Sequence, residues 1–134
     1  MVLNVLVADD SAVMRAMIIK SLRLSGLPLG DVHEASSGEE GLEVLDQNWV
    51  DLALVDLNMP DMNGEEMIEK LRENPSTSDL SVVVVSTEGS ETRIERLLNE
   101  STQFIHKPFT PESLRETIME AIGHRMGNKM EEEL

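Results

Sequence analysis

Five short runs of apolar residues alternate along the chain with longer stretches in which apolar residues recur every three or four positions. The runs are "LNVLVA" (3–8), "DVHEA" (31–35), "DLALVD" (51–56), "SVVVVS" (81–86) and "QFIH" (103–106). The first, third and fourth runs are apolar almost throughout rather than alternating. This pattern is typical of strands that are buried on both faces of a parallel sheet.

The stretches between the runs predict helices, and three of them begin with a helix cap. Ser11 precedes the first helix, a capping box of Ser37–Glu40 opens the second, and Thr110 followed by Pro111 opens the last. The predicted helices cover residues 11–25, 38–47, 64–73, 91–99 and 111–122.

Strand and helix therefore alternate five times, which favours an α/β fold with right-handed crossovers and a doubly wound parallel sheet. We expect residues 1–122 to form the domain. The end of the chain, 123–134, is polar and loses its periodicity. It reads as a frayed tail or as the start of a linker.

The amino-acid composition limits the classes of function that the chain can have. A length of 134 residues with an apolar fraction of 40% favours one folded domain over a disordered chain. The net charge of −15 disfavours binding to nucleic acid or to an anionic membrane, and suits a protein that holds cations or meets a basic partner. The absence of cysteine, of a signal peptide and of a membrane span predicts a cytoplasmic location.

Polar residues stand where the predicted strands end. Asp9 and Asp10 end the first strand, Asp56 the third and Ser86 the fourth, and Lys107 follows the fifth. Each alone has an ordinary structural explanation, such as a turn, a cap or a solvated charge. In a parallel sheet, however, all the carboxyl ends lie at one edge, where ligands bind.

Three carboxylates at such short distances repel one another unless a cation is bound between them. Oxygen ligands without histidine or cysteine suit Mg²⁺. Lys107 adds a second positive charge, and the helix N-termini at this edge add backbone donors. The site is therefore suited to holding a dianionic phosphoryl group beside a carboxylate.

The motifs "VADDSAVMR", "LALVDLNMPDMNG", "VVVVST" and "FIHKPFT" together resemble the receiver domain of two-component response regulators, and most closely its single-domain chemotaxis type. The resemblance covers residues 3–122. It implies a three-layer, flavodoxin-like (βα)5 fold with a parallel five-stranded sheet of order 2-1-3-4-5. It also implies a phosphorylation switch.

The resemblance assigns roles to the residues at this edge. Asp56 would be the phosphoacceptor. Asp9 and Asp10, together with Asp56 and the main-chain carbonyl of Asn58, would hold Mg²⁺. Lys107 would pair with a phosphoryl oxygen.

Other positions would transmit or time the signal. Ser86 would hydrogen-bond the phosphoryl group, and Phe104 stands at the family's aromatic switch position. Asn58, Thr87 and Glu88 would tune dephosphorylation. Three residues depart from the usual pattern: Thr87 replaces an Ala or Gly, Phe104 lacks the hydroxyl of a Tyr, and Glu100 stands where a Gly commonly ends the fourth helix.

The implied partners are a sensor histidine kinase and a downstream protein. The downstream protein would read the face formed by residues 91–99, 103–106 and the last helix. An alternative is an interaction module of the same fold that signals without phosphorylation. A Mg²⁺-dependent phosphohydrolase would need a second acid two residues after Asp56, where this chain has Asn58. We therefore expect no separate enzyme substrate.

Overall fold

The computed structural model describes residues 2–86, 95, 98 and 101–133, and for Ser86 and 124–133 it describes the backbone only. Five parallel strands form one sheet of order β2-β1-β3-β4-β5, which confirms the predicted order. The strands are β1 (Leu3–Ala8), β2 (Leu29–Ala35), β3 (Leu52–Asp56), β4 (Ser81–Ser86) and β5 (Thr102–His106). The helices are α1 (Ala12–Leu24), α2 (Gly38–Gln47), α3 (Gly64–Glu73) and α5 (Pro111–Glu133).

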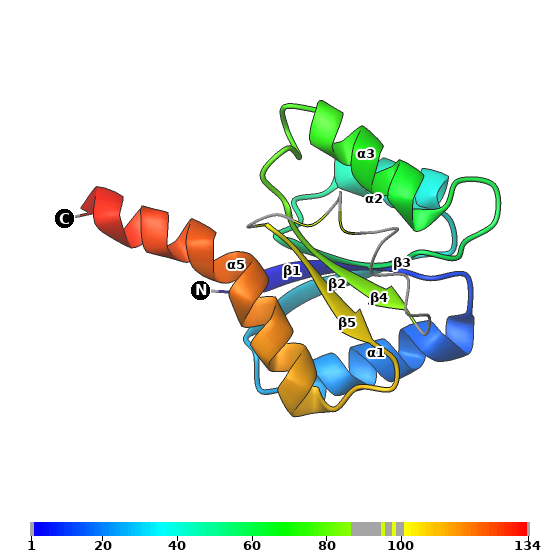
Figure 1. The fold of residues 1–134 in the computed structure, drawn as a ribbon, viewed down its shortest axis with the longest axis horizontal. Coiled ribbons are helices and arrows are strands. Elements are labelled where there is room, and N and C mark those ends of the chain that lie inside the picture. Colours follow the sequence, from blue (N-terminus) through cyan, green and yellow to red (C-terminus); the bar gives the residue numbers. More distant parts are fainter. Residues whose placement is uncertain (1, 87–94, 96–97, 99–100, 134) are drawn as a thin grey trace.

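The helices cover the two faces of the sheet as separate layers, with α2 and α3 on one face and α1 and α5 on the other (Figure 1). Each layer has its own apolar core. Leu6, Val55, Met67, Ile68 and Val84 pack on the α2–α3 side, whereas Val7, Ile18, Leu54, Leu114 and Ile118 pack on the α1–α5 side. Neighbouring strand residues thus point into opposite cores, which explains why β1, β3 and β4 are apolar throughout.

The caps predicted from the sequence are confirmed, one of them only in part. The Ser11 hydroxyl accepts a hydrogen bond from the Met14 amide at 3.1 Å. At α2, the Ser37 hydroxyl accepts from the Glu40 amide at 3.1 Å. The Glu40 carboxylate accepts from the Ser36 hydroxyl at 2.9 Å. The second half of this capping box is therefore made to a neighbouring side chain.

Most predicted boundaries agree with the structure to within two residues. The largest difference among the strands is β2, which begins at Leu29 rather than at residue 31. The helix predicted over 91–99 lies outside the described residues.

The last helix is longer than its apolar stripe predicts. α5 continues to Glu133 and extends away from the sheet in Figure 1, where the sequence analysis expected a frayed tail or the start of a linker from residue 123. Among the positions of this helix whose burial is described, which end at Gly123, Ile122 is the last buried one. The division into a domain of residues 1–122 and a separate tail stays a prediction.

Candidate functional site

Strand pairing delivers three aspartates to one edge of the sheet. β1 pairs with β3 so that Ala8 lies opposite Val55, which places Asp9 and Asp56 side by side just beyond the paired segment. Asp10 follows Asp9 and precedes α1. The three carboxylates each offer an oxygen within 4.8 Å of the others. We call Asp9, Asp10 and Asp56 the carboxylate cluster.

The loop after Asp56 is tight because of three residues in the "MPDMNG" motif. Asp61 adopts the left-handed conformation with φ of 63°, which Asp tolerates better than most residues. The Asn63 side chain caps α3 by accepting from the Glu66 amide at 3.0 Å. A Cβ on Gly64 would collide with the carbonyl oxygen of Asp56, so only glycine fits this close approach.

Burial distinguishes the members of the carboxylate cluster. Asp9 is 1% exposed and Asp56 is 7% exposed, whereas Asp10 is exposed to solvent. The Lys107 ammonium lies 3.2 Å from Asp9 Oδ2 and 3.9 Å from Asp56 Oδ1, and its own side chain is 10% exposed. Among the described residues, three carboxylates thus lie near the one Lys107 ammonium, which leaves an excess of negative charge in this described part of the edge.

The electrostatics of Asp56 follow from this arrangement. Burial raises the pKa of Asp56 above its ordinary value, the Lys107 charge lowers it, and the neighbouring Asp9 charge raises it again. A hydrogen bond from the Asn58 backbone lowers the pKa, and Asp10 raises it further. The net shift of the pKa is upward, so ionisation of the Asp56 carboxyl is less favourable in the folded metal-free protein than in the unfolded chain.

This upward shift predicts that Asp56→Asn stabilises the metal-free protein at neutral pH. Because the folded-state pKa lies above the unfolded one, the folded state binds more protons in the window between them. Stability is therefore lost as pH rises through the folded pKa, and is regained below the unfolded pKa of about 3.9. Urea unfolding should give a higher midpoint for Asp56→Asn at pH 7, and the difference from wild type should shrink towards pH 4. An Asp56→Asn variant less stable than wild type at pH 7 would contradict the pKa shift.

The structure places some, but not all, of the other residues that the sequence analysis named as site candidates. The register of β4 sets Val85 opposite Asp56, which puts the backbone of Ser86 at the same edge. Phe104 is partly buried against the α2–α3 core, and its ring meets His106 edge-on with centroids 4.4 Å apart. Thr87 and Glu88 lie outside the described residues.

Arg15 was not identified from the sequence. Its guanidinium donates to the main-chain carbonyl of Asp9 at 2.6 Å and to Glu34 at 2.9 Å. The Ser11 amide also donates to Asp9 Oδ1 at 2.9 Å. Together these contacts hold the buried aspartate in place. An arginine four residues after a cap carries no sequence signal of its own that would have pointed to this role.

The chain belongs to the response regulator receiver domain family, whose model matches residues 5–119. It is 35% identical to a chemotaxis protein CheY homolog of Campylobacter jejuni over 93% of this chain and 96% of that one. It is 36% identical to chemotaxis protein CheY1 of Helicobacter pylori over 90% and 98%. The structure of the chemotaxis response regulator CheY4 of Vibrio cholerae, at 28% identity, covers 90% of this chain and 99% of its own with a TM-score of 0.77.

These comparisons confirm the predicted family, its link to two-component signalling and the flavodoxin-like fold. Members of the family serve as signalling switches rather than as enzymes that turn over a separate substrate. Among the described residues, no helix is both long and apolar enough to cross a membrane.

Proposed function

We propose that this protein is a phosphorylation-activated switch that accepts a phosphoryl group on Asp56. The observation that carries the proposal is the setting of Asp56, which lies buried at the carboxyl edge of the sheet, beside Lys107 and the other two carboxylates. Labelling by a small phosphodonor, and its dependence on Asp56, tests the proposal.

The carboxylate of Asp56 is the nucleophile. One of its oxygens attacks phosphorus and forms an O–P bond, while the P–N bond to a phosphohistidine of a sensor kinase breaks and its electron pair returns to the imidazole. Lys107 sits close enough to Asp56 to pair with an oxygen of the arriving group. The Lys107 ammonium would then interact both with the phosphoryl oxygen and with Asp9, its present ion-pair partner.

The carboxylate cluster fits Mg²⁺. It offers oxygen ligands from three acids, two of them buried, with charge well in excess of the single lysine. Asp9, Asp10, Asp56 and the main-chain carbonyl of Asn58 would hold the ion. When bound, Mg²⁺ would neutralise the charge on the phosphoryl oxygens.

The signal leaves the site through Ser86 and Phe104. The Ser86 hydroxyl would hydrogen-bond a phosphoryl oxygen, and the end of β4 would move towards Asp56. Phe104 on the neighbouring strand would then turn inward, since its ring is only partly buried against the core. The face built from residues 91–99, β5 and α5 would change shape for a downstream protein. Such a switch needs a few kcal/mol of preference for the phosphorylated arrangement.

This route predicts that Ser86→Ala separates phosphorylation from its output. The variant should still accept a phosphoryl group, because Asp56 and the carboxylate cluster are unchanged. Beryllofluoride, which mimics the phosphoryl group, should then shift amide NMR signals near residues 56–64 but not across 91–118. Shifts across 91–118 as large as those of wild type would count against the route.

Water hydrolyses the acyl phosphate at a rate that Asn58, Thr87 and Glu88 tune, because Asn58 follows Asp56 by two residues and the other two follow β4, the strand that pairs with β3. The partners in this proposal are a histidine kinase and a downstream protein, with neither nucleic acid nor membrane bound directly. A cytoplasmic location follows from such partners and stays a prediction.

A further inference from the structure

Asp9 and Asp10 share one peptide group, and that group lies just beyond the paired part of β1. The pairing of β1 with β3 ends where Ala8 lies opposite Val55. On the other side of β1, the Asp9 amide still donates to the Ala35 carbonyl at 3.0 Å. The next peptide plane carries the Asp9 carbonyl and the Asp10 amide, and its orientation depends on contacts from outside the sheet.

Arg15 makes such a contact. Its Nη1 donates to the Asp9 carbonyl at 2.6 Å, and its Nε donates to Glu34 Oε1 at 2.9 Å. Arg15 stands in the first turn of α1, where side chains lean back towards the helix N-terminus. Its side chain is only 16% exposed, against 50% for Glu34. The guanidinium therefore ties the shared peptide group to the end of β2.

The orientation of this peptide group matters most for Asp10. A peptide group is planar, so a fixed Asp9 carbonyl also fixes the amide and the Cα of Asp10. The Asp9 carboxylate has partners of its own, because the Ser11 amide donates to Oδ1 at 2.9 Å and the Lys107 ammonium donates to Oδ2 at 3.2 Å. Asp10 is exposed to solvent, so the placement of its backbone has more influence on where its carboxylate lies.

We propose that Arg15 is a positioning residue for the magnesium site, an inference that rests on the proposed function. By holding the shared peptide group, Arg15 presents the Asp10 carboxylate to the ion together with the rest of the carboxylate cluster. A guanidinium has no acceptor atom, so Arg15 is not itself a ligand. Residues that orient metal ligands typically contribute about tenfold to a hundredfold to metal affinity. Lysine would be a poor replacement, because an ammonium is a compact donor without the rigid fork.

Charge and position predict opposite effects for the loss of Arg15. The guanidinium is a positive charge beside a cation site, so by electrostatics alone its removal should tighten Mg²⁺ binding. If Arg15 acts by holding the peptide group, its removal should weaken Mg²⁺ binding instead. The direction of the change in Kd therefore separates the two roles.

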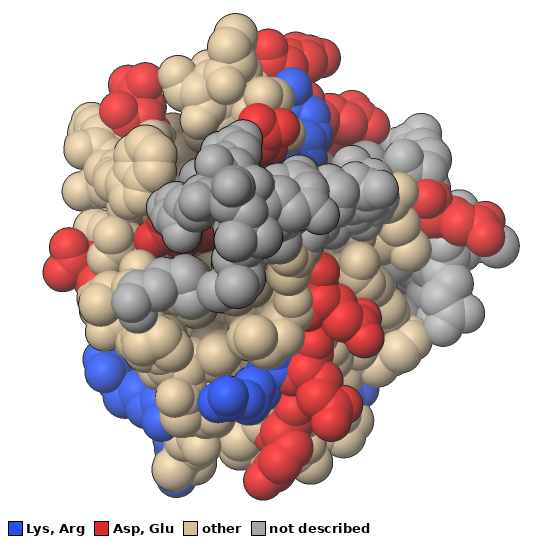
Figure 2. All heavy atoms as spheres, turned by 90° about the vertical axis from the view of Figure 1, so that its left-hand side faces the viewer, with Lys and Arg blue, Asp and Glu red and all other residues tan. Residues whose placement is uncertain are grey.

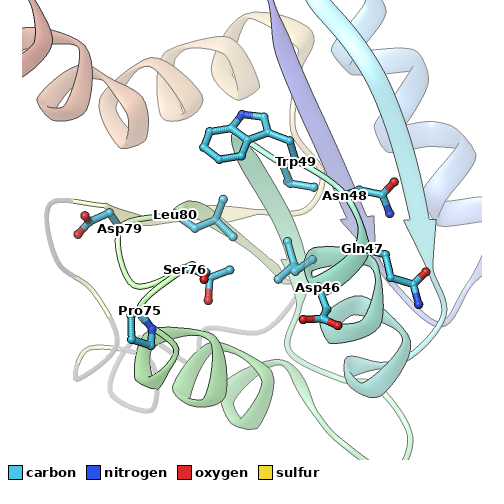
Figure 3. A pocket seen from close by; sticks show the side chains of 11 residues that line it. Asp46, Gln47, Asn48, Trp49, Pro75, Ser76, Asp79 and Leu80 are labelled. Carbon is cyan, nitrogen blue, oxygen red and sulfur yellow. The ribbon is translucent and has the colours of Figure 1, made fainter.

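Diffuse binding of Mg²⁺ to the acidic surface is the effect to be separated from the site. The chain carries a net charge of −15, and Figure 2, which faces the amino edge of the sheet, shows acidic side chains spread over that side. Asp46 and Asp79, for example, line a hollow at this edge (Figure 3). Arg15 lies at the carboxyl edge, so Mg²⁺ binding that depends on Arg15 reports on the carboxylate cluster.

The test measures Mg²⁺ binding to the full chain by calorimetry and by the rise of Tm with Mg²⁺ concentration. Arg15→Gln should raise Kd about tenfold, near the lower end of the expected range because the loss of charge opposes the effect. Arg15→Lys keeps the charge and should still raise Kd at least about threefold. At saturating Mg²⁺, acetyl phosphate should label Arg15→Gln to the wild-type extent, because Asp56 and Lys107 are unchanged. A merely structural role would lower Tm without Mg²⁺ and leave Kd as it is.

Two controls change charge elsewhere. Arg23→Gln removes the same charge from the last turn of α1, and Asp46→Asn removes an acid from the amino edge, so both should bind Mg²⁺ as wild type does. A Kd that is unchanged or lower in Arg15→Gln, or unchanged in Arg15→Lys, would overturn the proposal, as would equal changes in the controls. A wild type that binds no Mg²⁺ would overturn the magnesium site of the proposed function and this inference with it, whereas binding that ignores Arg15 overturns this inference alone.

Discussion

Incubation with acetyl phosphate and Mg²⁺ should add one phosphoryl group to the wild-type protein and none to Asp56→Asn. Asp56 combines a buried carboxylate, a lysine ammonium 3.9 Å away and two further acids able to hold a cation. An asparagine amide of nearly the same shape lacks the nucleophilic oxygen. The loss should therefore be complete rather than partial, and intact-mass spectrometry measures it directly.

Two controls make this result decisive. Asp61→Asn changes an acid in the same loop, and Asn tolerates the left-handed backbone at that position as well as Asp does, so its labelling should match wild type. Asp56→Asn is itself expected to be more stable than wild type, so a failure to label would not reflect unfolding. Labelling of Asp56→Asn equal to wild type would place the acceptor elsewhere. A wild type that takes no label would favour the phosphorylation-independent module.

The fold was predictable because nearly every element carries a local signal that agrees with its environment. β1, β3 and β4 are apolar on both faces because each lies between the two helical layers. β2 was the weakest prediction, since this edge strand is buried only in part and its first residues read as a turn. At the other end, the apolar stripe of α5 stops at Ile122 while the helix continues to Glu133, because a helix needs no apolar stripe to continue.

That these polar residues meet at one edge of the sheet was predictable from the sequence, whereas the distances among them were not. The rule that parallel strands share a carboxyl edge brings together Asp9, Asp56 and Lys107, which are far apart in sequence. Adjacent acids look equivalent in a sequence, yet Asp9 is buried and Asp10 is exposed. Lys107 also lies nearer to Asp9 than to Asp56, because side-chain reach and packing decide such distances.

The second large effect concerns the metal. Asp10→Asn should raise the Mg²⁺ concentration needed for half-maximal labelling by about tenfold or more, because it removes one charge from a cation site whose other acids stay in place. Asp10 tests the metal more cleanly than Asp9 does. Asp9 is buried and ion-paired with Lys107, so its replacement would also release the lysine.

Mg²⁺ binding can also be measured without a phosphodonor, through its effect on thermal stability. Mg²⁺ that binds only the folded protein raises its stability by RT ln(1 + [L]/Kd), so thermal unfolding at several Mg²⁺ concentrations gives Kd for each variant. Asp10→Asn should need a correspondingly higher concentration for the same rise in Tm. Asp61→Asn, which removes the same charge from an exposed loop residue outside the carboxylate cluster, should behave as wild type in both measurements. If Asp10→Asn and Asp61→Asn shift the Mg²⁺ dependence equally, the acids at this edge form only a diffuse patch, and the magnesium site is wrong.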